Sequence, residues 1–285
     1  MDHAARPFRS VLYIPGSKGR ALEKAQSLPA DAIIFDLEDA VAVSEKARAR
    51  ALLVQALMAS DYGRRARIVR INGLETPWGH EDLAALRGMA IEGVLLPKVN
   101  APGDIAALAE LLPDLPLWAM IETPRGVLAS AAIAAHPRMA GLVLGTNDLA
   151  KELGASFRAD RLPLLASLQH CLLAARSHGL VCLDGVYNAF MDEAGLRNEC
   201  AQGRDMGFDG KTLIHPAQLA TANQVFAPSE EEINLARRQM DAHAAAEAEG
   251  QGVAVVDGRI VENLHIVTAR QILSRAALIA EMENE

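Results

Sequence analysis

The stretch from Pro116 to Asp148, PLWAMIETPRGVLASAAIAAHPRMAGLVLGTND, decides the fold class of this chain. It begins with one short apolar run and ends with another, and each run finishes in polar or acidic residues. The residues between the two runs have helical periodicity. Nearly continuous hydrophobicity within each run indicates a strand that is buried on both faces, as in a parallel sheet. The stretch therefore predicts a strand, a helix and a second, parallel strand.

The same alternation continues along most of the chain. The apolar runs are SVLYIPG from Ser10, AIIFDLED from Ala32, ARIVRING from Ala66, GVLLPKVN from Gly93, PLWAMIET from Pro116, GLVLGTND from Gly141, VCLDGVYN from Val181 and GKTLIHP from Gly210. Gly, Pro, Asn or Asp bounds each run, and a stretch with helical periodicity follows it, with Ser44 and Asp104 expected as helix N-caps.

Eight strand–helix units most simply close into an α/β fold of the (β/α)8 TIM-barrel type, which typically needs about 250 residues. The chain has 285 residues. An open, doubly wound sheet is the alternative, but the first turn, PGSKGR, lacks the GxGxxG pattern of a dinucleotide site. We therefore predict a barrel domain over residues 1–226.

The character of the sequence changes after the eighth unit. Pro228 and Ser229 precede three glutamates, a typical capped start of a charged helix. A hairpin that turns at Asp257–Gly258 follows, and then a last helix from Asn263. We predict that residues 227–285 form a C-terminal helix–hairpin–helix appendage.

Composition excludes several classes of protein. The net charge is −8 with no block of Lys and Arg, which argues against a nucleic-acid partner. The three cysteines have no CxxC spacing, so neither a disulfide framework nor a thiolate metal site is expected. No apolar run approaches the roughly 20 residues that span a bilayer. We expect a cytoplasmic protein that does not bind membranes.

Polar residues follow most of the apolar runs, and in a barrel these positions gather at the end where active sites lie. They are Asp36, Glu38, Asp39, Arg70, Asn72, Lys98, Glu122, Asn147, Asp148, Asp184, Tyr187, Asn188 and His215. A single buried charge is costly unless it is paired or binds a ligand, and most lone cases are structural ion pairs. So many such residues at one end predict a functional site.

Glu122 and Asp148 are the best candidates for metal ligands. Oxygen ligands without cysteine suit Mg²⁺, which commonly uses one or two carboxylates and keeps several waters. The alternative is that both carboxylates form salt bridges with Arg70 and Lys98. With a metal present, Arg70 would instead bind a substrate carboxylate or a developing oxyanion. Lys98 as a Schiff-base lysine is a further, less favoured alternative.

The turn after the first strand contains a group of cations. Arg20 and Lys24 are four residues apart on one helix face, close to Ser17 and Lys18, and Tyr13 precedes them. Such a group could hold the phosphates of a large anionic ligand, although exposed Lys and Arg on a first helix are ordinary.

These residues carry a resemblance to a known family. SVLYIPGS, FDLEDAV, VRING, LLPKV, MIETPRG, LGTNDLAKELG, DGVYN and MGFDGKTLIHPAQL, in this order, resemble the citrate lyase β-subunit-like family of the HpcH/HpaI aldolase–citrate lyase superfamily. The resemblance runs from about Arg9 to the C-terminus. Members act on malyl-CoA, β-methylmalyl-CoA, citramalyl-CoA, 3-hydroxy-3-methylglutaryl-CoA or a carrier-bound citryl thioester.

The resemblance implies a magnesium-dependent carbon–carbon lyase of a small β-hydroxyacyl-CoA thioester. It implies that Glu122 and Asp148 bind Mg²⁺ and that Arg70 contacts the substrate. It also implies that Tyr13, Arg20 and Lys24 contact the CoA thioester, and we add Asn147 to these binding residues and Asp36 to the catalytic ones. Cleavage would release a thioester enolate, whose oxygen Arg70 stabilises.

Family members are commonly trimers or hexamers in which the appendage of one subunit closes the site of the next. In the malyl-CoA lyase branch that segment carries an acidic Asp in a Met-Ile-Asp-Met-Pro-like context. Here the matching residues are Ile260, Val261, Glu262, Asn263 and Leu264. We therefore expect a homo-oligomer in which Glu262 protonates the enolate carbon.

Three other functions stay open at this point. One is a metal-dependent aldolase for free 2-oxo acids, against which the cations of the first turn and the appendage argue. The others are a citryl-thioester lyase subunit and a non-catalytic subunit that binds an acyl carrier or CoA. Metal-dependent turnover by the isolated chain would separate an enzyme from a binding module.

Overall fold

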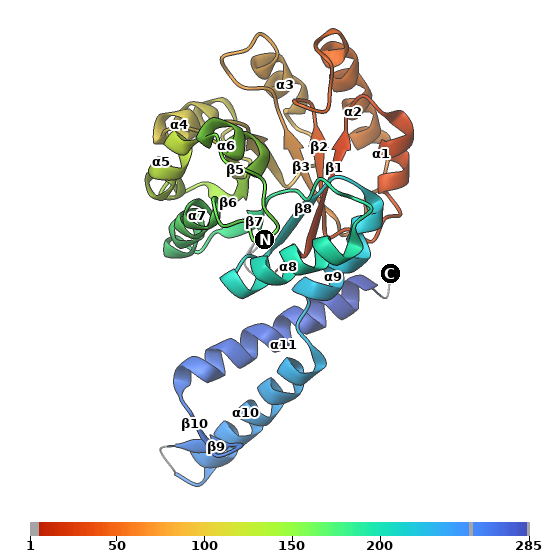
Figure 1. Ribbon diagram of the computed structural model, residues 1–285. Helices are drawn as coiled ribbons and strands as arrows, with labels where there is room; N and C mark the ends of the chain where they lie inside the picture. Colours follow the sequence, from red (N-terminus) through yellow and green to blue (C-terminus); the bar gives the residue numbers. More distant parts are fainter. Residues whose placement is uncertain (1–5, 251–252, 284–285) are drawn as a thin grey trace. The chain divides into compact units, whose positions relative to one another are not determined.

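The computed structural model describes residues 6–250 and 253–283, and Figure 1 shows the arrangement of its elements. The chain divides into two compact units, a barrel of Phe8–Phe226 and a second unit that contains Ala227–Glu285. The strands of the barrel are β1 (Ser10–Pro15), β2 (Ala32–Asp36), β3 (Ala66–Arg70), β4 (Gly93–Leu96), β5 (Leu117–Ile121), β6 (Met139–Leu144), β7 (Val181–Asp184) and β8 (Gly210–Leu213).

Helices alternate with these strands and surround them (Figure 1). They are α1 (Gly19–Ala25), the 3₁₀ helix η1 (Val43–Glu45), α2 (Lys46–Ala59), α3 (Gly79–Leu86), α4 (Pro102–Leu111), α5 (Pro124–Ala134), α6 (Thr146–Leu153), α7 (Leu165–Ser177), α8 (Glu193–Met206), the 3₁₀ helix η2 (Pro216–Gln218) and α9 (Leu219–Phe226).

The eight strands form one closed parallel barrel in the order β1 to β8, and β8 pairs with β1. The predicted TIM-barrel class is confirmed, and the open sheet is excluded. Side chains alternate between the two faces of each strand. In β2, for example, Ile34 packs inside the barrel, while Ile33 and Phe35 pack against the surrounding helices.

Trp118 fills the interior of the barrel. It is almost fully buried, and the ring of Phe8 packs edge-on against it with 5.4 Å between ring centroids. Gly93 and Gly141 on the neighbouring strands make room for the indole, since a Cβ at either position would lie within 2.7 Å of a ring atom. The interior is therefore a packed core, and chemistry is confined to its ends.

Two expected helix caps are wrong. Ser44 lies inside η1, and α2 begins after it without a side-chain cap. Asp104 is the third residue of α4, where its carboxylate accepts hydrogen bonds from the backbone N–H groups of Asn100 and Ala101. Pro102 occupies the first turn of α4, where a missing N–H costs nothing.

The second unit contains α10 (Glu230–Ala248), the strands β9 (Ala254–Val256) and β10 (Arg259–Val261), and α11 (Asn263–Glu283). Ser229 and Glu232 form a capping box at the start of α10. The hairpin turns at Asp257 and Gly258, which both have positive φ, as a two-residue type I′ turn requires. The helix–hairpin–helix prediction is confirmed.

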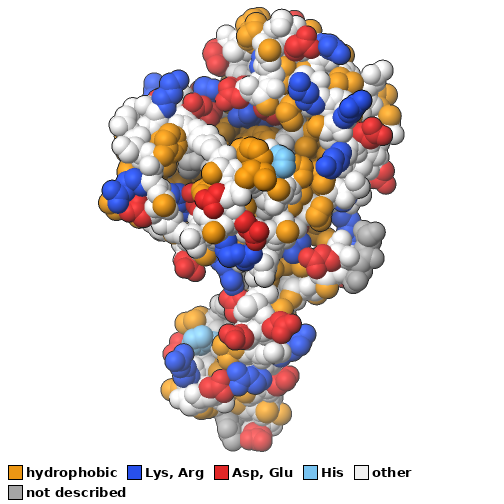
Figure 2. Space-filling model, turned by 45° about the vertical axis from the view of Figure 1, so that its right-hand side comes forward, with side chains coloured by type: hydrophobic (Ala, Val, Ile, Leu, Met, Phe, Trp, Pro, Cys, Tyr) orange, Lys and Arg blue, Asp and Glu red, His pale blue; other side chains and the backbone are white. Residues whose placement is uncertain are grey.

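On the face that Figure 2 presents, Lys and Arg side chains are interspersed with Asp and Glu. Within residues 6–250 and 253–283, no helix combines the length and the apolar character needed to cross a bilayer.

Candidate active site

The candidate site lies at the carboxyl ends of the strands, on the inner face of the barrel. Tyr13, Asp36 and Arg70 are each two residues beyond an inward-facing Val11, Ile34 or Ile68. Glu122 likewise lies two residues beyond Met120, which faces inward on β5. The period of two therefore directs all four side chains to the barrel mouth.

Arg70 is the best-connected residue of this group. It is only 6% exposed, and its Nε and Nη2 donate to the two carboxylate oxygens of Asp36, both at 2.7 Å. Its Nη1 lies 3.2 Å from Glu38 Oε2, and its guanidinium carbon lies 4.9 Å from the centre of the Tyr13 ring. Burial raises the pKa of the Tyr13 phenol above its usual range, so this ring stays neutral. A fixed guanidinium at the mouth can stabilise a developing negative oxygen.

Asp36 is fully engaged by donors. Besides the two bonds from Arg70, it accepts the backbone N–H groups of Glu38 and Ala40, both at 2.9 Å. These donors occupy both carboxylate oxygens. The geometry therefore favours a positioning role, in which Asp36 holds Arg70.

Lys98 joins the same network from the segment after β4. Its Nζ lies 2.7 Å from Glu38 Oε1. Burial disfavours its charge, but the hydrogen bond with Glu38 and the nearby carboxylates raise the pKa of Lys98 to about 12. Lys98 is thus protonated at neutral pH, which argues against a Schiff-base role. Its φ of 50° is unusual for a non-glycine residue, and its backbone N–H donates to Glu122 Oε1 at 2.7 Å.

Glu122 is almost completely buried, with 1% exposure. Burial raises its pKa to about 7, although Lys98 and Arg70 oppose the shift. Its side chain lies against Gly145, where a Cβ would come within 2.6 Å of Oε2. Gly145 precedes α6, and the half-buried Asp148 lies in the first turn of that helix. The structure thus places the two expected metal ligands on neighbouring elements at one end of the barrel.

The chemistry of these donors fits a magnesium ion. The salt bridges of Arg70 and Lys98 go to Asp36 and Glu38, and not to Glu122 or Asp148 as the alternative interpretation expected. In the described part of the chain, no group of three or more His, Cys, Asp or Glu could hold a metal. Two carboxylates with waters or substrate oxygens as the other ligands are the arrangement that Mg²⁺ prefers.

The remaining expected binding residues are exposed. Arg20 and Lys24 project from α1 next to β1. Asn147 forms a reciprocal amide pair with Asn188, with bonds of 3.1 and 2.8 Å. The pair joins α6 to the segment after β7 and leaves each amide with further donor and acceptor capacity.

Two of the strand-end residues do not belong to the site. Asp184 follows the inward-facing Leu183, so it points out of the barrel towards α8. There it lies 2.9 Å from Nζ of Lys211 on β8 and 2.7 Å from Nη1 of Arg161, which precedes α7. Asn72 is buried and donates to Asp82. Both are structural. Residue parity along β7 distinguishes Asp184, but Asn72 shares the parity of Arg70 and only its contact with Asp82 assigns it.

Met120 is a site residue that the sequence analysis missed, and its Sδ lies 3.5 Å from Arg70 Nη1. Its position two residues before Glu122 on the same strand face was the signal that could have identified it.

Glu262 lies in the second unit, between β10 and α11, and is exposed. Its backbone N–H donates to His265 Nδ1 at 2.9 Å. Its action on a neighbouring subunit stays a prediction.

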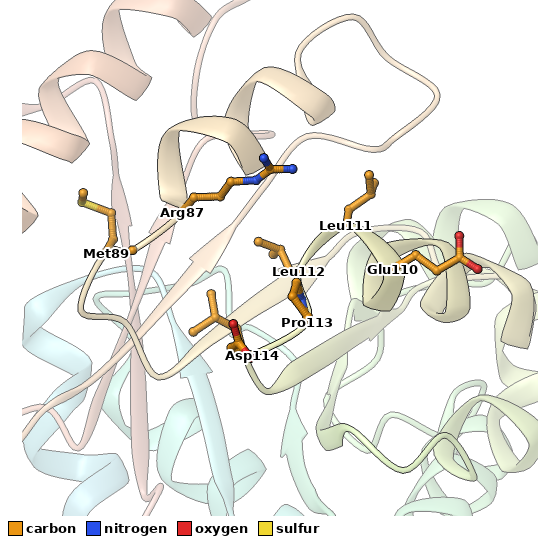
Figure 3. Close-up of a pocket in the computed structure, with 9 residues that line it drawn as sticks. Arg87, Met89, Glu110, Leu111, Leu112, Pro113 and Asp114 are labelled. Carbon is orange, nitrogen blue, oxygen red and sulfur yellow. The ribbon is translucent and has the colours of Figure 1, made fainter.

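A cavity of about 640 Å³ lies elsewhere in the barrel. Its lining residues come from the end of α4 and from the loops that lead into β4 and β5, and they include Arg87, Glu110 and Asp114 (Figure 3). These loops are at the amino-terminal ends of the strands. The cavity is therefore at the opposite end from Arg70 and Glu122, away from the end where the active sites of this fold lie.

A family model described as HpcH/HpaI aldolase/citrate lyase matches residues 9–216, which include the whole candidate site in the barrel. The chain belongs to this family. A (3S)-malyl-CoA thioesterase of Cereibacter sphaeroides is 66% identical over 280 residues, which cover 98% of each chain. A citrate lyase subunit beta of Escherichia coli is 36% identical, with 96% of this chain and 94% of that protein covered.

A solved structure of the family has nearly the same extent. It is the protein CitE from Mycobacterium tuberculosis in complex with magnesium, acetoacetate and coenzyme A. It is 34% identical, covers 96% of this chain and 99% of its own, and superposes with a TM-score of 0.80. An L-malyl-CoA/beta-methylmalyl-CoA lyase of Cereibacter sphaeroides is also 34% identical, over 97% of this chain and 96% of that protein. The resemblance inferred from the motifs is thereby confirmed at family level.

Proposed function

We propose that this protein is a magnesium-dependent enzyme that hydrolyses the thioester of a small malyl-type acyl-CoA. The observation that carries the proposal is the 66% identity to a (3S)-malyl-CoA thioesterase over 98% of both chains. Thioester hydrolysis was not among the alternatives that the sequence suggested. It replaces carbon–carbon cleavage as the first candidate because the lyases and citrate lyase subunits that the comparisons name are 34–36% identical.

Glu122 and Asp148 are the residues that would hold the magnesium ion. When bound, the ion would polarise the oxygens of the hydroxy-acid half and fix its position. Arg70 would face the thioester carbonyl and stabilise the negative charge that develops on its oxygen. Asp36 and Tyr13 keep the guanidinium in place, and Lys98 keeps Glu38 in place. Arg20 and Lys24 would bind the CoA phosphates, and Asn147 would contact the substrate.

Carbon–carbon cleavage is the second candidate, favoured by the family match and by the malyl-CoA lyase relative. It would use the same oxyanion partner, because the leaving fragment is a thioester enolate. It also needs a proton donor to the enolate carbon, the role we propose for Glu262. Hydrolysis needs no such donor, and Glu262 stands where the lyase branch has Asp.

The products of (3S)-malyl-CoA with Mg²⁺ test both candidates. Hydrolysis gives malate and free CoA, which a thiol reagent detects. Carbon–carbon cleavage gives glyoxylate and acetyl-CoA, with no free thiol. We expect thiol release that EDTA abolishes. Glyoxylate without thiol would establish the lyase reaction instead, and CoA binding without either product would support a non-catalytic subunit.

We further propose that the enzyme is a cytoplasmic homotrimer or homohexamer. The appendage of residues 227–285 is the segment proposed to reach the neighbouring subunit. Light scattering coupled to size-exclusion chromatography would measure the assembly. A monomer at micromolar concentration would contradict the proposal.

A further inference from the structure

The turn after β4 contains a strained backbone that the proposed reaction does not explain. Lys98 has a φ of 50°, in the left-handed region that residues other than glycine rarely adopt. Strain of this kind persists only where the surroundings enforce it, and it is common at functional sites. The contacts of the turn show what enforces the strain and what it positions.

Asn100 holds the turn in this conformation. Its Nδ2 donates to the carbonyl of Lys98 at 2.8 Å, and its Oδ1 accepts the hydroxyl of Thr123. Its own backbone N–H donates to Asp104 Oδ2 at 2.8 Å. Asp104 belongs to α4, and Thr123 is the N-cap residue of α5. The left-handed turn is therefore tied to both helices.

The segment after β5 packs tightly against the same turn. A Cβ on Gly126 would lie 2.4 Å from the carbonyl oxygen of Val99, so only a glycine lets α5 approach this closely. Val99 is fully buried, and its N–H donates to the carbonyl of Met120 at 3.2 Å. The turn is therefore fixed relative to the end of β5, which leads directly to Glu122.

The enforced turn directs one backbone donor at Glu122. The N–H of Lys98 donates to Oε1 of Glu122 at 2.7 Å. The other oxygen, Oε2, lies against Gly145, where a Cβ would come within 2.6 Å of it. Gly145 precedes α6, whose first turn carries Asp148. The hydrogen bond from Lys98 therefore occupies Oε1, and Oε2 is the oxygen on the side of the second expected metal ligand.

The side chain of Lys98 has a different partner. Its Nζ lies 2.7 Å from Oε1 of Glu38, whose Oε2 lies 3.2 Å from Arg70 Nη1. The backbone of Lys98 thus contacts the metal ligand, and its ammonium contacts the group around Arg70. Substitutions can separate these two contacts, because asparagine lacks the ammonium and still adopts a left-handed backbone.

We propose that Lys98 and Asn100 are positioning residues of the magnesium site, in which the left-handed backbone of Lys98 orients Glu122 for the ion. The proposal rests on the proposed function, because that function requires magnesium at Glu122. Groups that hydrogen-bond to a metal ligand fix its orientation, and their loss commonly weakens metal binding by about 10- to 100-fold. A carboxylate that is already oriented also loses less freedom when the ion binds.

Calorimetric titration of the metal-free protein with Mg²⁺, at a single pH and without substrate, tests the role of the backbone. Lys98→Val and Lys98→Asn both remove the ammonium, but only the β-branched valine resists a positive φ. Lys98→Val should bind Mg²⁺ about 10- to 100-fold more weakly than the wild type. Lys98→Asn and Lys98→Gly should both bind it within about twofold of the wild type, because both residues adopt the turn.

Asn100→Ala tests the same device from its other side. It keeps the side chain of Lys98 and removes the side chain that holds the turn, so Mg²⁺ should bind about 10-fold more weakly. Asn198→Ala removes an exposed asparagine of α8 and should bind Mg²⁺ as the wild type does. Thermal melts report the fold of each variant separately. If Lys98→Val fails to fold, Asn100→Ala decides.

The possible outcomes separate the two proposals. Wild-type Mg²⁺ affinity in Lys98→Val or in Asn100→Ala would overturn the positioning role. An equal loss in Lys98→Asn and Lys98→Val would also overturn it, because the ammonium would then be the group that matters. A wild-type protein that binds no Mg²⁺ would overturn the proposed function, and the positioning role with it. If the affinities follow the expected order but no thioester is hydrolysed, only the proposed function fails.

Discussion

Asp36 and Arg70 are direct partners in the parallel pairing of β2 and β3, and their side chains form two hydrogen bonds of 2.7 Å at the barrel mouth. The strand register therefore fixes the position of the guanidinium before substrate arrives. Glu38 and the Tyr13 ring complete its surroundings. An oxyanion partner that is held in this way pays little reorganisation during the reaction.

Asp36→Asn should lower kcat by about 10²-fold, because the amide cannot hold the Arg70 fork and a small misplacement is costly. It should also lower the free energy of unfolding by on the order of 3 kcal/mol, since it breaks a buried ion pair. Kinetics and urea denaturation measure the two effects. Asp39→Asn, at an exposed position in the same loop, is the control. Wild-type kcat in Asp36→Asn would refute the positioning role.

Arg70→Lys should fail nearly as badly as Arg70→Met, with kcat lower by about 10²–10³-fold. A lysine ammonium is a point charge and cannot bridge both oxygens of Asp36 while facing the substrate. Steady-state kinetics with (3S)-malyl-CoA measure the loss. Near-normal turnover by the Lys variant would show that only the charge is needed.

Glu122 should make magnesium affinity depend on pH. Its pKa is about 7 in the metal-free fold, against an ordinary value of 4.5, and Mg²⁺ needs the deprotonated form. Affinity should therefore rise as the pH passes through 7, and Glu122→Gln should lose both the binding and its pH dependence. Calorimetric titration of the protein with Mg²⁺ at several pH values between about pH 5 and about pH 8 measures this dependence. The exposed Glu23→Gln should behave as the wild type.

The same shift predicts how stability changes with pH without metal. A pKa raised by folding means that the folded state binds the proton of Glu122 more tightly than the unfolded state does. The stabilisation that this proton gives the folded state is therefore full below pH 4.5 and is lost as the pH rises through about 7. The metal-free protein should therefore lose stability between about pH 5 and about pH 8. The Glu122→Gln variant should lose less stability over the same pH range. An equal change in both proteins would contradict the assigned pKa.

Glu262→Gln distinguishes the two candidate reactions. Hydrolysis should be unaffected, because it needs no proton at carbon. Any glyoxylate formation should fall by about 10²–10⁴-fold, the usual contribution of a general acid. Product analysis of the same (3S)-malyl-CoA reaction measures both. Unchanged glyoxylate formation would show that Glu262 is an ordinary exposed residue.

Lys211→Met should destabilise the barrel by about 3–5 kcal/mol. Lys211 is fully buried, and its loss leaves Asp184 and Glu199 without one of their cations. Denaturant unfolding measures the effect. Arg158→Met breaks the exposed Arg158–Asp160 pair and should leave the midpoint nearly unchanged. If both variants unfolded at the same midpoint, the buried network would contribute nothing.

The sequence by itself determined the barrel, its eight strands and the appendage. Strand and helix periodicity and the Asp257–Gly258 turn are local signals, and each of these elements formed where its residues predicted it. The family followed from the order of the motifs, and a family model confirms it. The caps at Ser44 and Asp104 failed because the first turn of a helix depends on how the preceding loop packs.

Only the tertiary structure decided which strand-end residues act together. Arg70 and Asn72 have the same parity along one strand, yet Arg70 binds Asp36 at the barrel mouth and Asn72 binds Asp82. Glu38 and Lys98 are 60 residues apart and meet because they follow β2 and β4, the two strands that pair with β3. The pairing of Phe190 with His215 likewise depends on Gln218, which joins two separate segments. Such contacts arise from strand register and closure of the barrel, which bring together residues that no local pattern connects.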